Sequence, residues 1–173
     1  MGVCFAVALI LAVTAALALS LRALGSTGVP VRASTDDAIA AALDLLELEP
    51  GDHLVDLGCG QGDVLLAARR RADVTADGYE LNPSVALLAA LRGLTDSKLH
   101  VRFGDSRQAD LSAATALYAY LMPRAMTEWA PKLAALKSGT RIVSVDFELP
   151  GWTAKATRTV GPLAQPVRLY VVQ

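Results

Sequence analysis

Three glycines at alternate positions follow a carboxylate at the end of an apolar run. The run is His53–Leu57, which contains Asp56, and the glycines are Gly58, Gly60 and Gly62. An apolar helical pattern begins directly afterwards. Because glycine has no Cβ, backbone N–H groups and a helix N-terminus can approach a bound ligand closely at such a turn. The stretch therefore predicts a strand, a tight turn and a helix that together hold a ligand.

A second carboxylate, Glu80, ends the strand-like segment Asp77–Glu80. A carboxylate at this point can accept hydrogen bonds from both hydroxyls of a ribose, and it repels a 2′-phosphate. The dinucleotide fingerprint would place its third glycine at the position of Asp63, so the glycine spacing differs from that fingerprint. NAD-binding enzymes nevertheless also bind the ribose hydroxyls through a carboxylate at this position. Glu80 thus indicates an adenosine-containing cofactor without identifying it.

Strand-like and helical segments alternate along the chain. Strands are predicted at 53–57, 77–80, 98–103, 114–121, 141–147, 156–160 and 167–172, and helices begin near 35, 64, 83 and 124. This alternation predicts an α/β fold with a doubly wound, mostly parallel sheet, whose ligands bind at the C-terminal ends of the strands. Asp56, Glu80, Asp105 and Met122-Pro123 all fall at such ends, so we expect them to converge on one edge.

The Asp-x-Gly-x-Gly-x-Gly form of Asp56–Gly62 resembles motif I of the class I S-adenosylmethionine-dependent methyltransferases. Three further segments occur in order: Gly78–Pro83, Tyr120–Pro123 and Phe147–Trp152. With the apolar N-terminus, they resemble the small membrane-anchored protein-lysine methyltransferases over about residues 29–152. Eukaryotic members of that family modify the ATP synthase c subunit and the adenine nucleotide translocase. The alanine-rich chain is typical of a prokaryotic member, and a prokaryote lacks the translocase, so these substrates do not transfer directly.

The resemblance implies a Rossmann-like class I methyltransferase domain with S-adenosyl-L-methionine as its cofactor. The residues that it assigns to the cofactor are Asp56, Leu57, Gly58, Cys59, Gly60, Gly62, Glu80, Leu81, Asp105 and Ser106. Cys59 is interpreted as a small turn residue whose backbone matters more than its thiol.

Methyl transfer from a sulfonium is an in-line displacement with a good leaving group. Alignment of the reactants can therefore replace strong acid or covalent catalysis, and no catalytic side chain is identified. Tyr120, Met122 and Pro123 are predicted to line an apolar channel for the acceptor lysine. Thr35 and Trp152 are candidates for the lips of this channel, although Trp152 could equally be a buried anchor of the C-terminal segment.

The N-terminal segment has the properties of a membrane span. Residues 3–21 contain no charged side chain, and only Thr14 and Ser20 are polar. A helix of this length spans about 28 Å, close to the ~30 Å of bilayer hydrocarbon. Met1-Gly2 does not supply the positive segment that opens a signal peptide. We therefore predict a retained single-pass membrane anchor.

This anchor divides the chain into an anchor at 1–24, a linker at 25–33 and a methyltransferase domain at 34–173. Arg22 and Arg32 follow the span, so the positive-inside tendency places the domain in the cytoplasm. The expected partners are the membrane, through residues 3–21, and a protein substrate embedded in it.

Several partners are disfavoured. The formal net charge of −1 gives no electrostatic case for a nucleic acid. The cysteines Cys4 and Cys59 lack metal-ligand spacing. Leu121–Arg124 lacks the Asp/Asn-Pro-Pro-aromatic pattern of methyltransferases that act on adenine N6. The basic run Arg69–Arg71 is interpreted as a solvated helix end.

The leading hypothesis is a methyltransferase for lysine in a membrane protein. Two alternatives stay open. One is a methyltransferase for a small molecule or lipid near the membrane, and the other is a non-catalytic or NAD-binding module with a similar turn.

Overall fold

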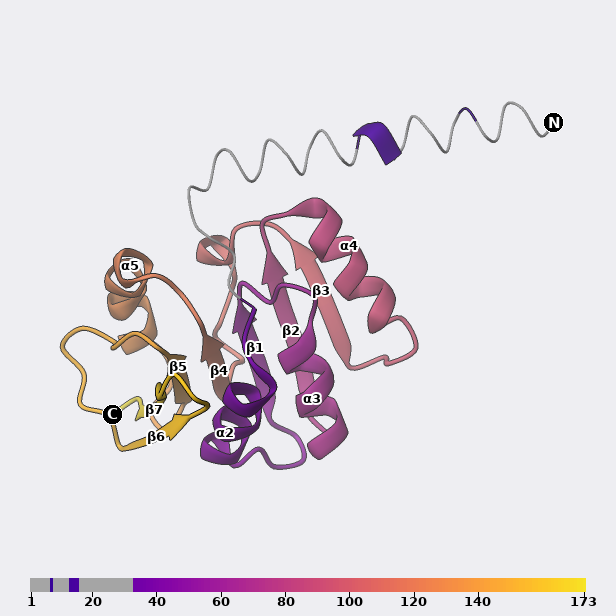
Figure 1. Cartoon of the computed structure of the whole chain (residues 1–173). Helices are drawn as coiled ribbons and strands as arrows, with labels where there is room; N and C mark the ends of the chain where they lie inside the picture. Colours follow the sequence, from indigo (N-terminus) through magenta and orange to yellow (C-terminus); the bar gives the residue numbers. More distant parts are fainter. Residues whose placement is uncertain (1–6, 8–12, 16–32) are drawn as a thin grey trace.

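The protein forms one open sheet with helices on both faces (Figure 1). The computed structural model describes residues 7, 13–15 and 33–173. Its helices are α2 (Asp36–Leu46), α3 (Asp63–Arg71), α4 (Pro83–Arg92) and α5 (Pro123–Ala134), with a short 3₁₀ turn η1 (Ser106–Gln108). Its strands are β1 (His53–Leu57), β2 (Thr75–Glu80), β3 (Leu99–Phe103), β4 (Ala116–Ala119), β5 (Arg141–Val145), β6 (Ala156–Val160) and β7 (Gln165–Val171).

The strand order is β3-β2-β1-β4-β5-β7-β6. Strands β1 to β5 pair in parallel, whereas β7 pairs antiparallel with both β5 and β6. The predicted doubly wound, mostly parallel sheet is therefore confirmed. Its order reverses between β1 and β4, and at such a switch point the loops after the two strands diverge and leave a crevice for ligands.

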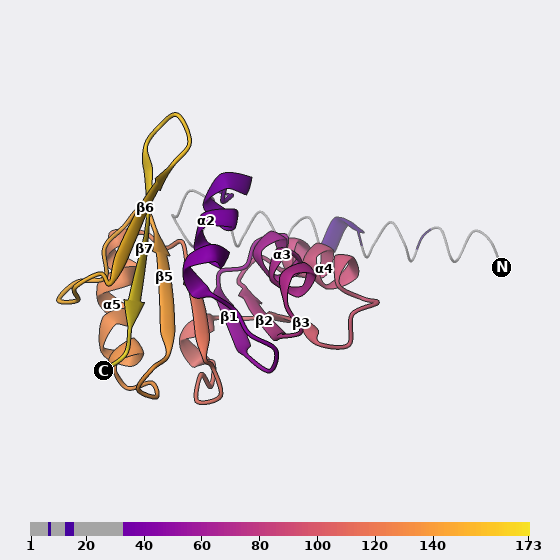
Figure 2. The same cartoon turned by 90° about the horizontal axis from the view of Figure 1, so that it is seen from below.

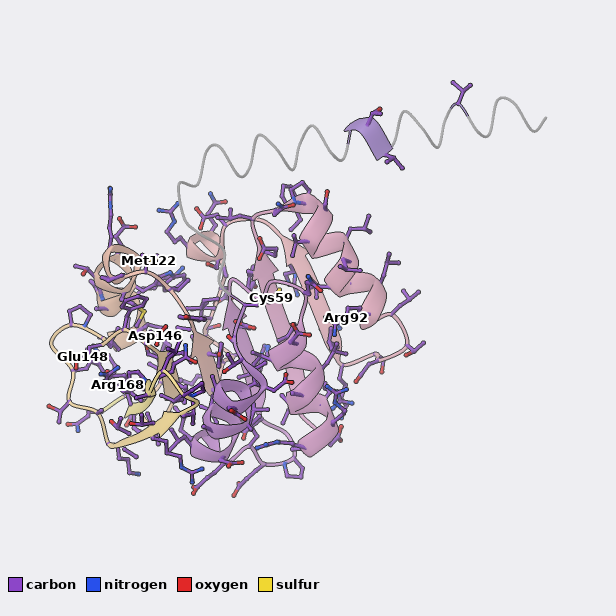
Figure 3. The ribbon with its side chains drawn as sticks, viewed as in Figure 1. Cys59, Arg92, Met122, Asp146, Glu148 and Arg168 are labelled. Carbon is purple, nitrogen blue, oxygen red and sulfur yellow. The ribbon has the colours of Figure 1, made fainter. Side chains whose placement is uncertain are left out.

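The helices divide between the two faces of the sheet (Figure 2). Helix α2 packs on β5 and β7, and α3 and α4 pack on β1, β2 and β3. Helix α5 covers the opposite face, where Met126, Trp129 and Leu133 join Leu117 and Ile142 in one buried cluster. Figure 3 shows the side chains on this framework, with Cys59 near the middle of the sheet.

Helix starts follow the capping signals of the sequence. The Thr35 hydroxyl accepts a hydrogen bond from the Ala38 N–H at 3.2 Å and so caps α2. The Asn82 side chain accepts one from the Ser84 N–H at 3.0 Å, and Pro83 begins α4. Such caps satisfy N–H groups that have no partner within the helix. They fix the positions at which both helices leave the ligand-binding edge.

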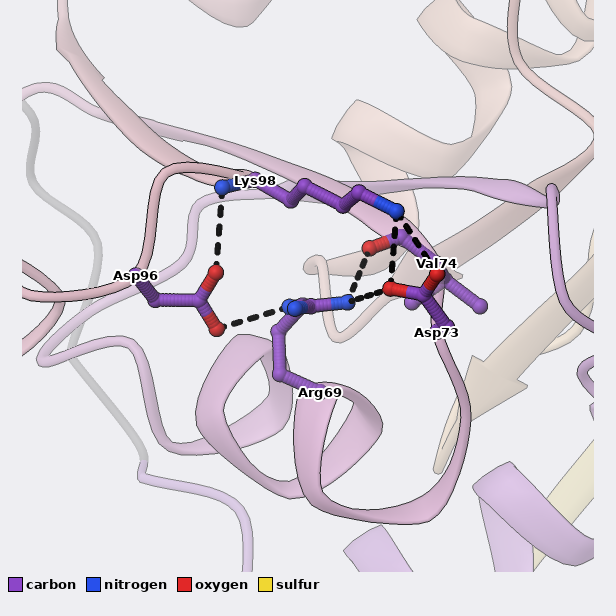
Figure 4. A network of polar contacts seen from close by, with 5 residues as sticks. All are labelled: Arg69, Asp73, Val74, Asp96 and Lys98. Atoms are coloured by element: carbon purple, nitrogen blue, oxygen red, sulfur yellow. Dashed lines mark hydrogen bonds and ion pairs between the residues drawn. The ribbon is translucent and has the colours of Figure 1, made fainter.

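The prediction that the basic run is solvated is wrong for Arg69 (Figure 4). Its Nε donates to Asp96 at 2.7 Å, and its Nη1 donates to Asp73 at 3.0 Å and to the Val74 carbonyl at 2.7 Å. Lys98 also pairs with Asp73, at 2.7 Å. The Arg69 side chain is only 17% exposed. It ties the end of α3 to the segments that enter β2 and β3, and thus holds that side of the sheet together.

Helix α4 presents an apolar face to solvent. Its exposed leucines and the one that follows it are 43–77% exposed: Leu87, Leu88, Leu91 and Leu94. In the described ranges, no helix combines the length and the apolar character that a membrane crossing requires. Apart from residues 7, 13–15 and 33, the predicted anchor (1–24) and linker (25–33) lie outside the described residues.

Candidate cofactor and acceptor site

The glycine turn lies at the C-terminal end of β1, as predicted. Gly58 and Gly62 adopt left-handed backbone conformations, with φ of 95° and 82°, which side chains disfavour. Gly62 is the N-cap of α3. The N–H groups of Gly58 and Cys59 both donate to the Tyr79 carbonyl, at 3.0 and 2.9 Å. The turn is therefore fastened to β2, the strand that ends in Glu80.

The underside of the turn packs directly on the backbone of β2. A Cβ on Gly78 would lie 2.6 Å from Leu65 Cδ1 and 2.7 Å from Cys59 Sγ, distances that no side chain tolerates without a shift of its neighbours. The Cys59 side chain points into this contact and is 6% exposed. Burial raises the pKa of its thiol above the usual value. Cys59 thus offers its backbone to a ligand, whereas its thiol fills the core.

Glu80 joins the two halves of the predicted cofactor site. Its Oε2 accepts a hydrogen bond from the Gly60 N–H at 3.0 Å, and its Oε1 accepts one from the Asn82 N–H at 2.8 Å. The side chain remains partly exposed. Each carboxylate oxygen has a further lone pair, so the group can still accept hydrogen bonds from two ribose hydroxyls.

Asp56 is almost fully buried. The residue is 2% exposed, and no hydrogen bond or ion pair of the described residues involves its carboxylate. Burial, with smaller contributions from the charges of Glu80 and Asp63, raises the pKa of Asp56 to about 8. An ionised carboxylate in such a place is costly unless a cation pairs with it. Without such a cation the Asp56 carboxyl group therefore stays protonated near neutral pH, and a bound cation would favour its ionised form.

Asp105 is already paired. Arg107 donates to its carboxylate through Nε and Nη2, at 2.9 and 2.7 Å, and through its backbone N–H at 2.9 Å. These bonds hold the pKa of Asp105 below its usual value. Ser106 follows as the first residue of η1, and Leu81, next to Glu80, is 45% exposed. That Asp105 contacts the adenine amino group stays a prediction, and Arg107 would have to share the carboxylate.

The structure brings two of the predicted channel residues together. Thr35 donates a hydrogen bond to Gln165 Oε1 at 3.4 Å, and Gln165 Nε2 donates to the Tyr120 hydroxyl at 3.3 Å. Met122 is 37% exposed between β4 and α5, and Pro123 is the first residue of α5. These residues lie around the C-terminal end of β4.

Trp152 does not join this group. Its ring packs edge-on against Tyr170, with centroids 6.3 Å apart and an interplanar angle of 87°. It belongs to the cluster beneath α5, whereas Tyr120 packs against the cluster beneath α2. The reading of Trp152 as a buried anchor of the C-terminal segment fits this position better than a place at the lips of the channel.

Asp146 and Gln165 were missed by the sequence analysis. The Tyr120 hydroxyl donates to Asp146 Oδ2 at 2.5 Å, and Gln165 Nε2 donates to the same oxygen at 3.1 Å. Figure 3 shows Asp146 on the β5 side of the molecule, with Glu148 and Arg168 nearby. One signal could have found Asp146, because it lies at the C-terminal end of a strand, as Asp56, Glu80 and Asp105 do. Gln165 belongs to no recognisable motif.

Comparison with known proteins identifies the family. Residues 56–156 match the ANTKMT methyltransferase domain. A protein-lysine N-methyltransferase of Saccharolobus islandicus is 30% identical over 151 residues, 83% of this chain and 94% of that protein. The mouse adenine nucleotide translocase lysine N-methyltransferase is 35% identical over 128 residues, 72% of this chain and 56% of that protein.

A solved structure extends the similarity to the fold. The RNA methyltransferase of Salinibacter ruber, in complex with S-adenosyl-L-homocysteine, is 28% identical, with a TM-score of 0.76 over 82% of this chain and 94% of that one. The Rossmann-like class I methyltransferase fold and S-adenosylmethionine as cofactor are thus confirmed.

The residues at the edge fit this cofactor. A Cβ on Gly60 would have no neighbour within 4 Å, so the space above the turn is open. The amino acid part of the cofactor carries an ammonium group that could pair with Asp56. Glu80 can still accept hydrogen bonds from the ribose hydroxyls. The predicted resemblance is confirmed, and the chain belongs to the ANTKMT methyltransferase domain family of S-adenosylmethionine-dependent methyltransferases.

Proposed function

We propose that this enzyme methylates the side-chain amine of lysine in a protein. The main support is the Saccharolobus protein-lysine N-methyltransferase, which this chain matches over 94% of that protein's length. The mouse relative, named for lysine in a translocase, points to the same acceptor chemistry. Two relatives from distant organisms therefore agree on the acceptor group.

In this proposal the cofactor supplies a methyl group on a sulfonium. Asp56 would pair with the cofactor ammonium, and Glu80 would accept hydrogen bonds from the ribose. Leu57, Gly58, Cys59, Gly60 and Gly62 would contribute backbone, while Leu81, Asp105 and Ser106 would surround the adenine. None of these residues takes part in bond making. Their task is to fix one orientation of the reactive end, and good alignment corresponds to effective molarities of about 10⁵–10⁸ M.

The acceptor would enter along Tyr120, Met122 and Pro123, with Thr35 at the outer end. A lysine ammonium has no lone pair and must first lose a proton. An apolar and aromatic surrounding lowers the pKa of an amine by desolvation, so the exposed Met122 and the ring of Tyr120 would favour the neutral nucleophile.

Transfer of a tritium-labelled methyl group from S-adenosylmethionine to cellular components tests this function. Cell lysate incubated with the full-length protein would be separated into protein, RNA and lipid, and labelled protein would be hydrolysed to identify the methylated amino acid. We expect methyl-lysine with the wild type and no label with Glu80→Ala. Label in the organic phase alone would instead select a lipid or small-molecule acceptor.

RNA is a second candidate acceptor. The Salinibacter protein is named an RNA methyltransferase, and the structural match covers 94% of its chain. The net charge of −1 offers little attraction for a polyanion. Leu121–Arg124 also lacks the side chains that grip an exocyclic amine in adenine methyltransferases. Label that is sensitive to ribonuclease in the same experiment would favour RNA over lysine.

We further propose that residues 3–21 anchor the enzyme in a membrane and that the domain lies on its cytoplasmic side. The uncharged sequence supports the anchor, and the exposed leucines of α4 are the kind of surface that lies well against lipid. Extraction of membranes with carbonate should leave the full chain in the pellet. Recovery of the protein in the supernatant would contradict the anchor.

A further inference from the structure

We propose that Tyr120, Asp146 and Gln165 form a binding site for the cationic amine of the acceptor, in which Asp146 carries the recognising charge. This inference rests on the proposed lysine acceptor and specifies how the enzyme would select it. Nothing in the sequence motifs marks Asp146 or Gln165.

Three separate strands bring these side chains to one point. Tyr120 follows β4, Asp146 follows β5 and Gln165 begins β7. Asp146 Oδ2 accepts hydrogen bonds from the Tyr120 hydroxyl at 2.5 Å and from Gln165 Nε2 at 3.1 Å. Thr35 holds the other end of the Gln165 amide, at 3.4 Å. One carboxylate oxygen is thus fixed by two donors, which sets the direction of the other.

The backbone at Asp146 is held in an unfavourable conformation. Its φ is 65°, and the Phe147 N–H donates across it to the Val145 carbonyl at 2.8 Å, which makes a tight γ-turn of the rare left-handed kind. The turn is clamped from β7, because the Asp146 N–H donates to the Pro166 carbonyl at 2.9 Å and Arg168 donates to the Asp146 carbonyl at 3.0 Å. Strain of this kind persists where the surroundings enforce it, and it concentrates at functional sites.

The remaining oxygen of Asp146 is available to a ligand. Among the described residues, Oδ1 accepts no hydrogen bond, and no Lys or Arg pairs with the carboxylate. Arg168 contacts the same residue, but its guanidinium binds the Asp146 backbone carbonyl and the Glu148 carboxylate. Asp105, by contrast, already forms an ion pair with Arg107. Asp146 is partly exposed, so a cation can reach it from solvent.

The site lies next to the glycine turn. Asp56 of β1 is paired in register with Tyr118 of β4, and Tyr120 lies two residues further along that strand. A Cβ on Gly58 would lie 3.7 Å from Leu121 Cδ2, so the end of β4 touches the turn itself. Asp146 follows β5, the strand beyond β4, so an amine bound there would lie at the same edge of the sheet as the cofactor, with the end of β4 between them.

The charge at Asp146 gives the reaction a defined proton path. Asp146 first binds the acceptor as its ammonium; where Met122 and the Tyr120 ring exclude water, a neutral pair costs less than an ion pair, so the ammonium transfers one proton to Asp146 Oδ1 and becomes a neutral amine. The amine nitrogen then forms its bond to the methyl carbon as the carbon–sulfur bond breaks, and the electron pair of that bond stays on sulfur. The positive charge ends on the methylated nitrogen, and Asp146 passes its proton to water. No oxidant, metal or further reactant is needed.

Binding of two labelled peptides to the full-length protein tests the site. The probes are fluorescein-labelled Gly-Ala-Lys-Ala-Gly and the same peptide with norleucine in place of lysine, measured by anisotropy with S-adenosyl-L-homocysteine present. We expect the wild type to prefer the lysine peptide by about tenfold or more, because a hydrogen bond to a charged group is among the stronger ones. Asp146→Asn should abolish the preference, and Tyr120→Phe should reduce it.

Glu148→Gln is the matched control, since it removes an exposed carboxylate two residues away and should keep the preference. Binding of S-adenosyl-L-homocysteine by calorimetry should be unchanged in Asp146→Asn, which also reports that the variant is folded. If Asp146→Asn keeps the preference while wild-type enzyme methylates lysine, the Asp146 site is refuted and the proposed function survives. If the wild type methylates no lysine at all, the proposed function itself is refuted.

Discussion

Replacing Asp56 by Asn should stabilise the protein without cofactor while weakening cofactor binding. The folded-state pKa of Asp56 is about 8, against 3.8 in the unfolded chain. Because the folded value is raised, the folded state holds a proton that the unfolded state has lost. The stabilisation from this group is therefore complete below about pH 4 and is lost as the pH rises through 8.

The magnitude follows from the width of this window. Each pH unit between the two pKa values costs about 1.4 kcal/mol of folding free energy. Between pH 5 and pH 8 the wild type should lose about 3–4 kcal/mol relative to Asp56→Asn, whose amide is neutral throughout. Urea unfolding of both proteins at four pH values in this range would measure the gap.

Asp37→Asn is the control, because Asp37 is exposed in the first turn of α2 and its removal takes the same charge from the surface. Its stability curve should run parallel to that of the wild type. Parallel curves for Asp56→Asn would refute the account of Asp56 as a buried, protonated acid. Calorimetry at pH 7 in buffers of different ionisation enthalpy should further show about one proton released when S-adenosylmethionine binds the wild type, and none in Asp56→Asn.

Three further predictions concern the glycine turn. Glu80→Gln should bind S-adenosylmethionine about tenfold or more weakly, as measured by calorimetry. The NH₂ of the glutamine amide would face a backbone N–H that donates to a carboxylate oxygen in the wild type. Unchanged affinity would remove Glu80 from the site. Gly78→Ala should destabilise the fold by about 1–3 kcal/mol in urea, because its methyl group would overlap Leu65 and Cys59; a neutral effect would contradict the packing described. In the Cys4→Ser variant, Cys59 should react with iodoacetamide at pH 8 at least about tenfold more slowly in the folded protein than in the unfolded protein, because its thiol is buried and its pKa is raised. Equal rates in the two states would show that the thiol is accessible.

The sequence predicts much of this fold because its local signals agree with the tertiary structure. The Thr35 and Asn82 caps, the proline at the start of α4 and the glycine turn are all short-range features, and the helices that they begin start close to the predicted positions. Glu80 was predictable because its place at a strand end and its spacing from the turn follow from the order of elements alone.

Other features depend on partners that are distant in the sequence. The sequence predicts that Arg69 is solvated, but the fold places Asp96 beside it. The role of Gln165 depends on β7 pairing between β5 and β6, an arrangement that local patterns do not specify. Asp56 and Asp105 look alike in sequence, yet Asp56 is buried and forms no hydrogen bond or ion pair among the described residues, whereas Asp105 is held by Arg107. Burial and pairing decide their chemistry, and both come from tertiary structure.

The hydrogen bond from the Gly60 N–H to Glu80 has a kinetic consequence. Since the turn is already fastened to the ribose-binding residue before any cofactor arrives, binding need not order this loop. The association rate should then be limited by encounter and desolvation instead of by a slow conformational step. Stopped-flow traces should show a single phase whose observed rate constant rises linearly with cofactor concentration.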